Sequence, residues 1–140
     1  MGVLIVDDMS IMRIIVKETL MNYCDVSGKL IYESDSGEDA IWKCKKLKPE
    51  IVFLDINMPG MDGIATIKEL LKIDPNIHIV MCTSIKDKAD VNKCIRAGAK
   101  DYIIKPPQPD RIIKAVGHLV EHLDNEIGDA LDALPEEPLP

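Results

Sequence analysis

Residues 51–63 read IVFLDINMPGMDG, in which a four-residue apolar run ends at Asp55 and a loop of turn-forming residues follows. A short, uninterrupted apolar run is typical of a strand that is buried on both faces of a parallel sheet. Proline and glycine in the loop interrupt regular structure. The stretch therefore predicts a buried strand with an aspartate at its carboxyl end.

The same order of elements, an apolar run and then a segment with helical periodicity, occurs five times along the chain. This alternation is typical of parallel strands covered by helices on both faces. We therefore predict an α/β fold of five βα units, (βα)5, whose doubly wound parallel sheet has the flavodoxin-like strand order 2-1-3-4-5. The expected strands are 3–6, 30–32, 51–54, 77–82 and 102–104, and the expected helices are 10–23, 36–48, 64–74, 87–97 and 110–124. Ser10 is expected to cap the first helix, and Gly98 to follow the end of the fourth.

The charge of the chain is unevenly distributed. The formal net charge is −7, but residues 124–140 contain six acidic residues and no lysine or arginine, so the preceding part is nearly neutral. This distribution argues against bulk binding to nucleic acids or anionic membranes. The expected division is one domain over residues 1–123 and an acidic, proline-containing tail over 124–140, which extends the last helix and then becomes disordered.

The sequence contains no targeting or membrane signal that we recognise. Its apolar runs are all far shorter than the roughly 20 residues of a membrane span, and no basic region precedes an apolar stretch at the N-terminus. The four cysteines have neither CxxC nor metal-ligand spacing, which favours buried thiols in a reducing compartment. We expect a cytoplasmic protein.

Polar residues stand at the carboxyl ends of four of the predicted strands: Asp7 and Asp8, Asp55, Thr83 and Lys105. The carboxyl ends of parallel strands meet at one edge of the sheet, where this class of fold binds its ligands. Three carboxylates in one crevice repel each other, and a divalent cation together with the lysine would balance their charge. Oxygen ligands favour a hard ion, so the pattern predicts a Mg²⁺ site.

These residues and their loops resemble the receiver domain of response regulators in two-component signalling, the CheY-like family. The resemblance covers about residues 2–123. Besides the polar residues at the strand ends, it rests on the stretches DINMPGMDG at 55–63 and GAKDYIIKP at 98–106. It implies a phosphoprotein that signals through protein contacts and is not an enzyme acting on a separate substrate.

The resemblance implies that Asp55 accepts a phosphoryl group from a histidine kinase in a Mg²⁺-dependent, self-catalysed transfer. The ion would be bound directly by Asp8 and Asp55 and, through water, by Asp7. The backbone carbonyl of Asn57 would be a further ligand. A carboxylate is an adequate nucleophile for phosphoryl transfer without a neighbouring base, which agrees with these roles.

The phosphoryl group is expected to contact Lys105 and the Thr83 hydroxyl, and Thr83 and Tyr102 are expected to form the switch. Movement of Thr83 and of the loop at 84–86 would let Tyr102 turn inward and change the surface of the last two helices and the last strand, which an unidentified downstream protein reads. The Lys105–Pro106 peptide bond is expected to be cis. Ile85 stands where some relatives that dephosphorylate themselves rapidly carry an acid, so slow self-dephosphorylation is expected.

We favour a receiver that stands alone, and three alternatives to it remain. The first is a receiver cut from a longer multi-domain regulator. A small Mg²⁺-dependent phosphatase with an aspartyl nucleophile is the second alternative, although enzymes of the haloacid-dehalogenase type carry an aspartate where this chain has Asn57. A flavodoxin-like FMN carrier is the third, although a phosphate-binding loop after the first strand and flanking aromatic residues are missing.

Overall fold

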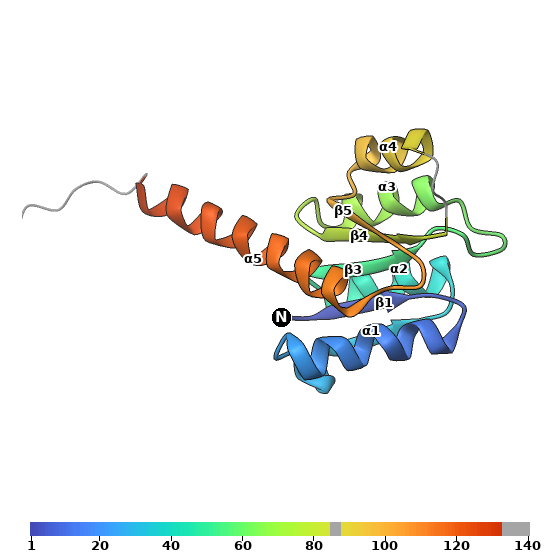
Figure 1. The fold of residues 1–140 in the computed structure, drawn as a ribbon. Coiled ribbons are helices and arrows are strands. Elements are labelled where there is room, and N and C mark those ends of the chain that lie inside the picture. The colour runs from blue at the N-terminus through green and yellow to red at the C-terminus, as the bar shows by residue number, and fades with distance from the viewer. Residues whose placement is uncertain (85–87, 133–140) are drawn as a thin grey trace, which may run out of the picture.

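Five parallel strands form the centre of the protein, in the order β2-β1-β3-β4-β5 (Figure 1). The structure, a computed structural model, describes residues 1–84 and 88–132, with the backbone alone for residue 88 and residues 122–132. Every neighbouring pair of strands is parallel. The predicted (βα)5 fold and its strand order are therefore confirmed.

The elements follow the predicted alternation. The strands are β1 (Val3–Val6), β2 (Ile31–Ser34), β3 (Ile51–Asp55), β4 (His78–Thr83) and β5 (Asp101–Ile104), and the helices are α1 (Ser10–Tyr23), α2 (Gly37–Leu47), α3 (Gly63–Ile73), α4 (Lys88–Ala97) and α5 (Pro109–Asp132). A short 3-10 helix, η1 (Gly28–Leu30), precedes β2 and begins where the Ser27 side chain accepts the Lys29 N–H. The second strand therefore starts one residue later than predicted.

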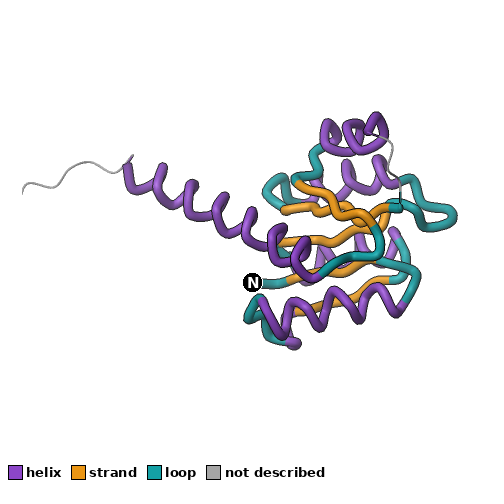
Figure 2. The backbone as a smooth tube through the Cα atoms, in the orientation of Figure 1, coloured by secondary structure: helices purple, strands orange, loops and turns teal. Residues whose placement is uncertain are grey.

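Helices cover both faces of the sheet (Figure 2). Two apolar layers hold them against it. In β1, Val3 and Ile5 belong to the layer that includes α1 and α5, whereas Leu4 and Val6 belong to the layer that includes α2, α3 and α4. This alternation arises because successive residues of a strand point to opposite faces. All residues of β1, β3 and β4 are buried, as the uninterrupted apolar runs predict.

Helix α1 has the predicted bounds, but its N-terminal cap differs from the prediction. Ser10 is the first helical residue, not the cap, and Met9 at the cap position makes no side-chain hydrogen bond to the helix. The Met9 N–H is instead donated to Oδ1 of Asp7 at 2.9 Å. The turn that leads into α1 is therefore fixed by the Asp7 side chain, which accepts the N–H of the residue two positions later. Aspartate commonly forms such a turn, and here it takes the place of a serine cap.

Gly98 directly follows α4, as predicted. Its φ of +121° lies in a region that residues with a side chain rarely adopt, and a Cβ there would lie 2.2 Å from Cδ1 of Leu71. The position therefore requires glycine both for its backbone conformation and for the close approach of α3.

Helix α5 continues beyond residue 124 as far as Asp132, where the sequence analysis expects an extension of the last helix. Its C-terminal part projects away from the sheet and the other helices (Figure 1). The expected disorder falls on residues 133–140, which lie outside the described residues. Among the helices of the described part, none is both long and apolar enough to cross a membrane.

Candidate functional site

Three strand ends bring charged side chains into direct contact. Asp7 follows β1, Asp55 ends β3 and Lys105 follows β5. The Nζ atom of Lys105 lies 2.8 Å from Oδ2 of Asp7 and 3.0 Å from Oδ2 of Asp55. Both carboxylates are buried, at 4% and 2% exposed. The predicted meeting of these residues at one edge of the sheet is therefore seen.

Asp8 completes an acidic cluster with the two buried aspartates. One carboxylate oxygen from each of Asp7, Asp8 and Asp55 lies within 4.8 Å of the others, and Asp8 alone among the three is exposed. Three carboxylates with one ammonium leave the cluster two negative charges in excess. Hard oxygen donors at this separation fit a divalent cation such as Mg²⁺.

The ionisation of Asp55 reflects this environment. Burial raises the pKa of the Asp55 carboxyl above its ordinary value, and the nearby Asp7 charge adds to the increase. Hydrogen bonds from the Asn57 N–H and from Lys105 act in the opposite direction but do not cancel the effect of burial. The carboxylate form of Asp55 is therefore destabilised in the folded protein, which a bound cation would relieve.

Lys105 is affected in the opposite sense. Burial favours the neutral amine, but hydrogen bonds and charge interactions with Asp7 and Asp55 outweigh it and raise the pKa of Lys105 above its ordinary value. The ammonium is therefore retained at neutral pH between the two buried carboxylates. Its backbone is also fixed, because the Lys105 N–H donates to the Thr83 carbonyl at 2.9 Å.

Hydrogen bonds hold the Asp55 carboxylate and the backbone carbonyl of Asp7 in place. The Asn57 N–H donates to Oδ1 of Asp55 at 2.8 Å. The guanidinium of Arg13 donates to the Asp7 carbonyl at 2.7 Å and also contacts Oε1 of Glu33 at 3.1 Å. The sequence analysis missed Arg13, because a single arginine inside a helix gives no signal that it reaches back to the preceding strand end.

Thr83 lies beside Asn57. Its hydroxyl is within 3.0 Å of the Asn57 side-chain oxygen, and the Ser84 N–H donates to the same oxygen at 3.1 Å. Thr83 is fully buried. The sequence analysis gave Asn57 a role for its backbone carbonyl only, and its side chain turns out to connect the loop after β3 with the end of β4.

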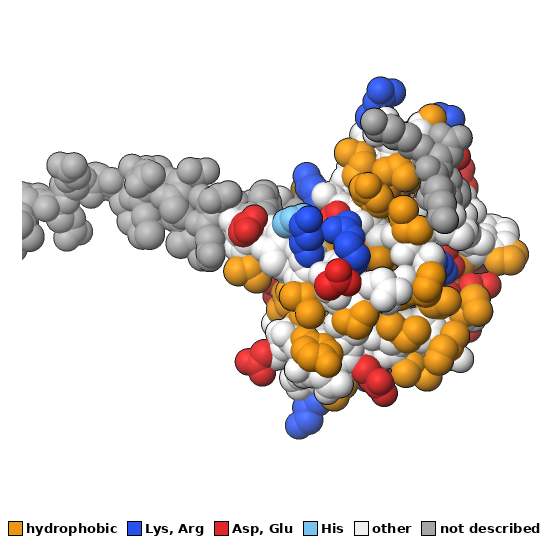
Figure 3. All heavy atoms as spheres, viewed as in Figure 1, with side chains coloured by type: hydrophobic (Ala, Val, Ile, Leu, Met, Phe, Trp, Pro, Cys, Tyr) orange, Lys and Arg blue, Asp and Glu red, His pale blue; other side chains and the backbone are white. Residues whose placement is uncertain are grey.

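Tyr102 lies away from the acidic cluster, on the surface of β5 and α5. Its side chain is 38% exposed, and its carbonyl accepts a hydrogen bond from Arg111 at 2.9 Å. Nearby, Asp101 pairs with Nδ1 of His118 at 2.6 Å. Figure 3 shows this face, with basic side chains and a histidine over α5 and hydrophobic side chains over α1 and near α4. The Lys105–Pro106 bond is cis, as expected.

A cleft of about 540 Å³ opens beside Asp8, between the start of α2 and the loop that follows β3. Gly37 at the start of α2 approaches Met61 of that loop so closely that a Cβ on Gly37 would lie 3.1 Å from the Met61 sulfur. Because Asp8 lines this cleft, the acidic cluster is accessible from solvent on this side. Ile85 and Lys86, which the sequence analysis placed in the moving loop, lie outside the described residues.

Comparison with known proteins gives consistent matches. A family model described as the response regulator receiver domain matches residues 3–117. The chain is 47% identical over 116 residues to the chemotaxis protein CheY of Thermotoga maritima, covering 81% of this chain and 92% of that protein. It is 40% identical over 114 residues to CheY of Bacillus subtilis, with the same coverage of both chains.

Solved structures agree with these sequence matches. The receiver domain of AraT, a response regulator from Geobacillus stearothermophilus, superposes with a TM-score of 0.78 at 29% identity, over 89% of this chain and 96% of that one. CheY4 of Vibrio cholerae superposes with a TM-score of 0.74 at 25% identity, over 84% of this chain and 97% of that one. Strand order, acidic cluster, family match and relatives all lead to one conclusion: the chain belongs to the response regulator receiver domain family of two-component signalling, and is homologous to CheY.

Proposed function

We propose that Asp55 accepts a phosphoryl group from the phosphohistidine of a histidine kinase, and that the chain passes this signal to a downstream protein. The observation that carries the proposal is the Asp55 carboxylate, buried beside Asp7 and Asp8 and contacted by Lys105 at 3.0 Å. Family membership supports a signalling role over the phosphatase and flavin-carrier alternatives. The names of the CheY relatives suggest chemotaxis as the pathway.

The transfer requires only one bond to form and one to break. A carboxylate oxygen of Asp55 attacks phosphorus, the bond from phosphorus to the donor's imidazole nitrogen breaks, and that nitrogen keeps the electron pair. The carboxylate needs no general base, because it has no proton to lose when ionised. What the protein contributes is positioning and charge stabilisation on the phosphoryl oxygens.

The contacts of Asp55 support this division of roles. The Asn57 N–H holds one carboxylate oxygen and Lys105 the other, which restricts rotation of the side chain. The retained charge of Lys105 suits it to contact a phosphoryl oxygen. Thr83, at the adjacent strand end, would contact another phosphoryl oxygen once its hydroxyl exchanges Asn57 for that oxygen.

The three carboxylates of the cluster and their excess of negative charge support Mg²⁺ as the bound ion. Asp8 and Asp55 would bind the ion directly, Asp7 through water, and Asn57 by its backbone carbonyl. Bound Mg²⁺ would neutralise negative charge between Asp55 and the incoming phosphoryl group.

The output would arise from Thr83 and Tyr102. Phosphorylation adds roughly −1.5 to −2 charge and three strong acceptors next to Thr83. Movement of Thr83 away from Asn57 would release the loop after β4 and let the half-exposed Tyr102 turn inward. The surface of α4, β5 and α5 would change with it. A shift of a few kcal/mol between two such states is enough to change binding by a partner.

The test is intact-mass measurement after incubation with acetyl phosphate, with and without Mg²⁺. We expect the wild-type chain to gain one phosphoryl group only when Mg²⁺ is present, and Asp55→Asn to gain none. Asp62→Asn is the matched control, because Asp62 lies in the same loop but caps α3 through the Ala65 N–H. A wild-type chain that gains no phosphoryl group, or an Asp55→Asn chain that still gains one, would refute the proposal.

A further inference from the structure

We propose that the acidic C-terminal segment of one copy of the chain, residues 124–140, binds a basic patch on α2 of a second copy. The α2 patch consists of Trp42, Lys45, Lys46 and Lys48. The inference does not depend on phosphoryl transfer, since neither the segment nor the patch belongs to the acidic cluster.

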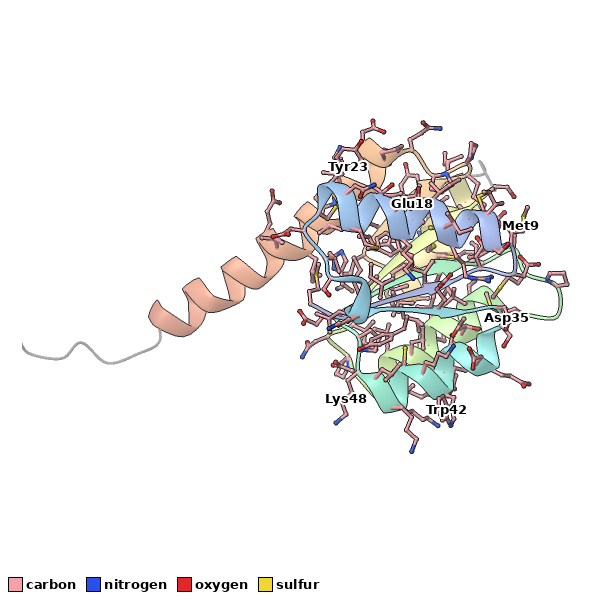
Figure 4. All side chains as sticks on the ribbon, turned by 90° about the horizontal axis from the view of Figure 1, so that it is seen from below. Met9, Glu18, Tyr23, Asp35, Trp42 and Lys48 are labelled. Carbon is pink, nitrogen blue, oxygen red and sulfur yellow. The ribbon has the colours of Figure 1, made fainter. Side chains whose placement is uncertain are left out.

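The α2 patch exposes an unusual side chain. Trp42 is the single tryptophan of the chain and is 57% exposed. Lys45 and Lys46 follow it by three and four residues and therefore lie on the same side of the helix. Figure 4 shows Trp42 on the outer side of α2 and Lys48 at its C-terminal end. An exposed tryptophan next to several lysines suits a partner that offers both apolar and acidic side chains.

The charges of the α2 patch are not neutralised within the described part of the chain. Lys43, on the same helix, has Nζ 2.9 Å from Oδ2 of Asp39 and donates to the Glu33 carbonyl, so it is engaged. None of the ion pairs within 4.0 Å among the described residues involves the three lysines of the patch. Lysines in the last turn of a helix interact favourably with the helix dipole, but this interaction does not explain why a tryptophan is exposed beside them.

The chain itself contains the complementary segment. Residues 124–140 hold six acidic residues and no lysine or arginine, with isoleucine and leucine interspersed. Helix α5 continues to Asp132, and Figure 1 shows this part of the ribbon leading away from the sheet. The backbone of the first part of the segment, residues 124–132, therefore lies away from the sheet of its own chain.

The arrangement of the helices disfavours binding of the segment to α2 of the same chain. Helices α2 and α5 pack on opposite faces of the sheet, and the helix leads the segment outward as far as Asp132. Binding to a second copy avoids this obstacle. Two copies related by a two-fold axis would exchange their segments, so that two contacts form together and strengthen each other. The overall charge of −7 disfavours nucleic acid as the occupant of the patch.

The experiment combines sedimentation velocity with the fluorescence of Trp42, which reports on the patch alone. At low ionic strength we expect the full chain to form dimers with rising concentration, and the Trp42 emission to shift to shorter wavelength over the same range. About 0.5 M NaCl should reverse both changes, because screening shortens the reach of charge interactions to a few ångströms. A chain that stays monomeric at low ionic strength, or dimers that leave the Trp42 emission unchanged, would overturn the proposal.

Charge reversal supplies the matched control. Lys45→Glu with Lys46→Glu should raise the dimer dissociation constant by about tenfold or more. Lys93→Glu with Lys100→Glu makes the same change in net charge on the α4 side of the molecule and should leave it near the wild-type value.

Rescue provides the final arm of the test. A chain with Glu136→Lys and Glu137→Lys, mixed with the Lys45→Glu, Lys46→Glu chain, should restore association that neither variant shows alone. If both charge reversals weaken the dimer equally, or if mixing restores nothing, the proposal is wrong. A monomer whose Trp42 emission shifts only on anionic vesicles would likewise overturn it and assign the patch to membranes.

Discussion

At the scale of single residues, the ionised Asp55 that phosphoryl transfer needs also lowers the stability of the folded protein. Burial raises its pKa, so the folded state binds a proton at Asp55 more readily than the unfolded state does. At pH values above the raised pKa, the buried carboxylate lowers the stability of the fold. This penalty disappears as pH falls through the raised pKa, because the folded protein then holds Asp55 neutral.

We therefore predict that Asp55→Asn increases the free energy of unfolding at neutral pH in Mg²⁺-free buffer, because the amide removes a buried negative charge whose pKa is raised by burial. Chemical denaturation as a function of pH measures this gain, which should shrink on acidification and also when Mg²⁺ is added to the wild type. An Asp55→Asn chain that is less stable than wild type under Mg²⁺-free conditions would contradict the interpretation.

Asp39→Asn is the control of opposite sign. A hydrogen bond from Lys43, followed by one from Ser34, lowers the pKa of Asp39. Its carboxylate therefore adds stability at neutral pH that is lost as pH falls through the lowered pKa. Because Asp39 is more than one-third exposed, the substitution should cost only a few tenths of a kcal/mol at neutral pH.

Ile85→Glu tests the expectation of slow self-dephosphorylation. Ile85 lies outside the described residues, so the expectation rests on the resemblance to receivers that carry an acid at this position. An acid that orients the attacking water should shorten the half-life of the phosphorylated chain several-fold. Loss of the phosphoryl group, followed by mass spectrometry, gives the half-life, and an unchanged value would count against the expectation.

At the scale of the elements, the sequence predicts the strands and helices because each has its own periodicity. It does less well where tertiary contacts decide. The contact of Asn57 with Thr83 joins two strand ends that meet only after folding, and the contact of Arg13 with the Asp7 carbonyl depends on how α1 packs beside the end of β1. The cap of α1 was wrongly assigned to Ser10, because the Asp7 side chain instead accepts the Met9 N–H at the turn before the helix.

Two glycines provide a matched prediction at this scale. Gly98→Ala should lower the free energy of unfolding by about 1–3 kcal/mol, since the new Cβ would strain a backbone with positive φ and would meet Leu71. Gly117→Ala, in α5, meets nothing within 4 Å and should raise stability by about 0.5–1 kcal/mol. Equal effects of the two changes in chemical denaturation would contradict this account of α4 and α3.

At the scale of the whole molecule, we propose that the receiver unit and the acidic segment are separable parts of one chain. The family match ends at residue 117, whereas α5 continues to Asp132. The sequence predicts that the last helix extends into residues 124–140 but does not give its last residue, since Gly128 and the many acids weaken a helical pattern without ending it. We propose residues 1–123 as the receiver and 124–140 as an attached acidic segment.

Limited proteolysis tests this division. At high salt, which suppresses association, a protease specific for acidic residues should first cleave between residues 124 and 140. The remaining fragment should unfold at nearly the same denaturant concentration as the full chain, because the two apolar layers lie within residues 3–119. Early cleavage within the sheet, or a fragment that no longer unfolds cooperatively, would argue against the division.

The central claim is that phosphorylation occurs on Asp55 and on no other carboxylate of the cluster. Borohydride reduction of the acetyl-phosphate-treated protein converts a phosphorylated aspartate to homoserine, and peptide mass spectrometry then locates the converted residue. The account predicts conversion at Asp55 alone, and only in samples that contained Mg²⁺. Conversion at Asp7 or Asp8, or none at all, would contradict it.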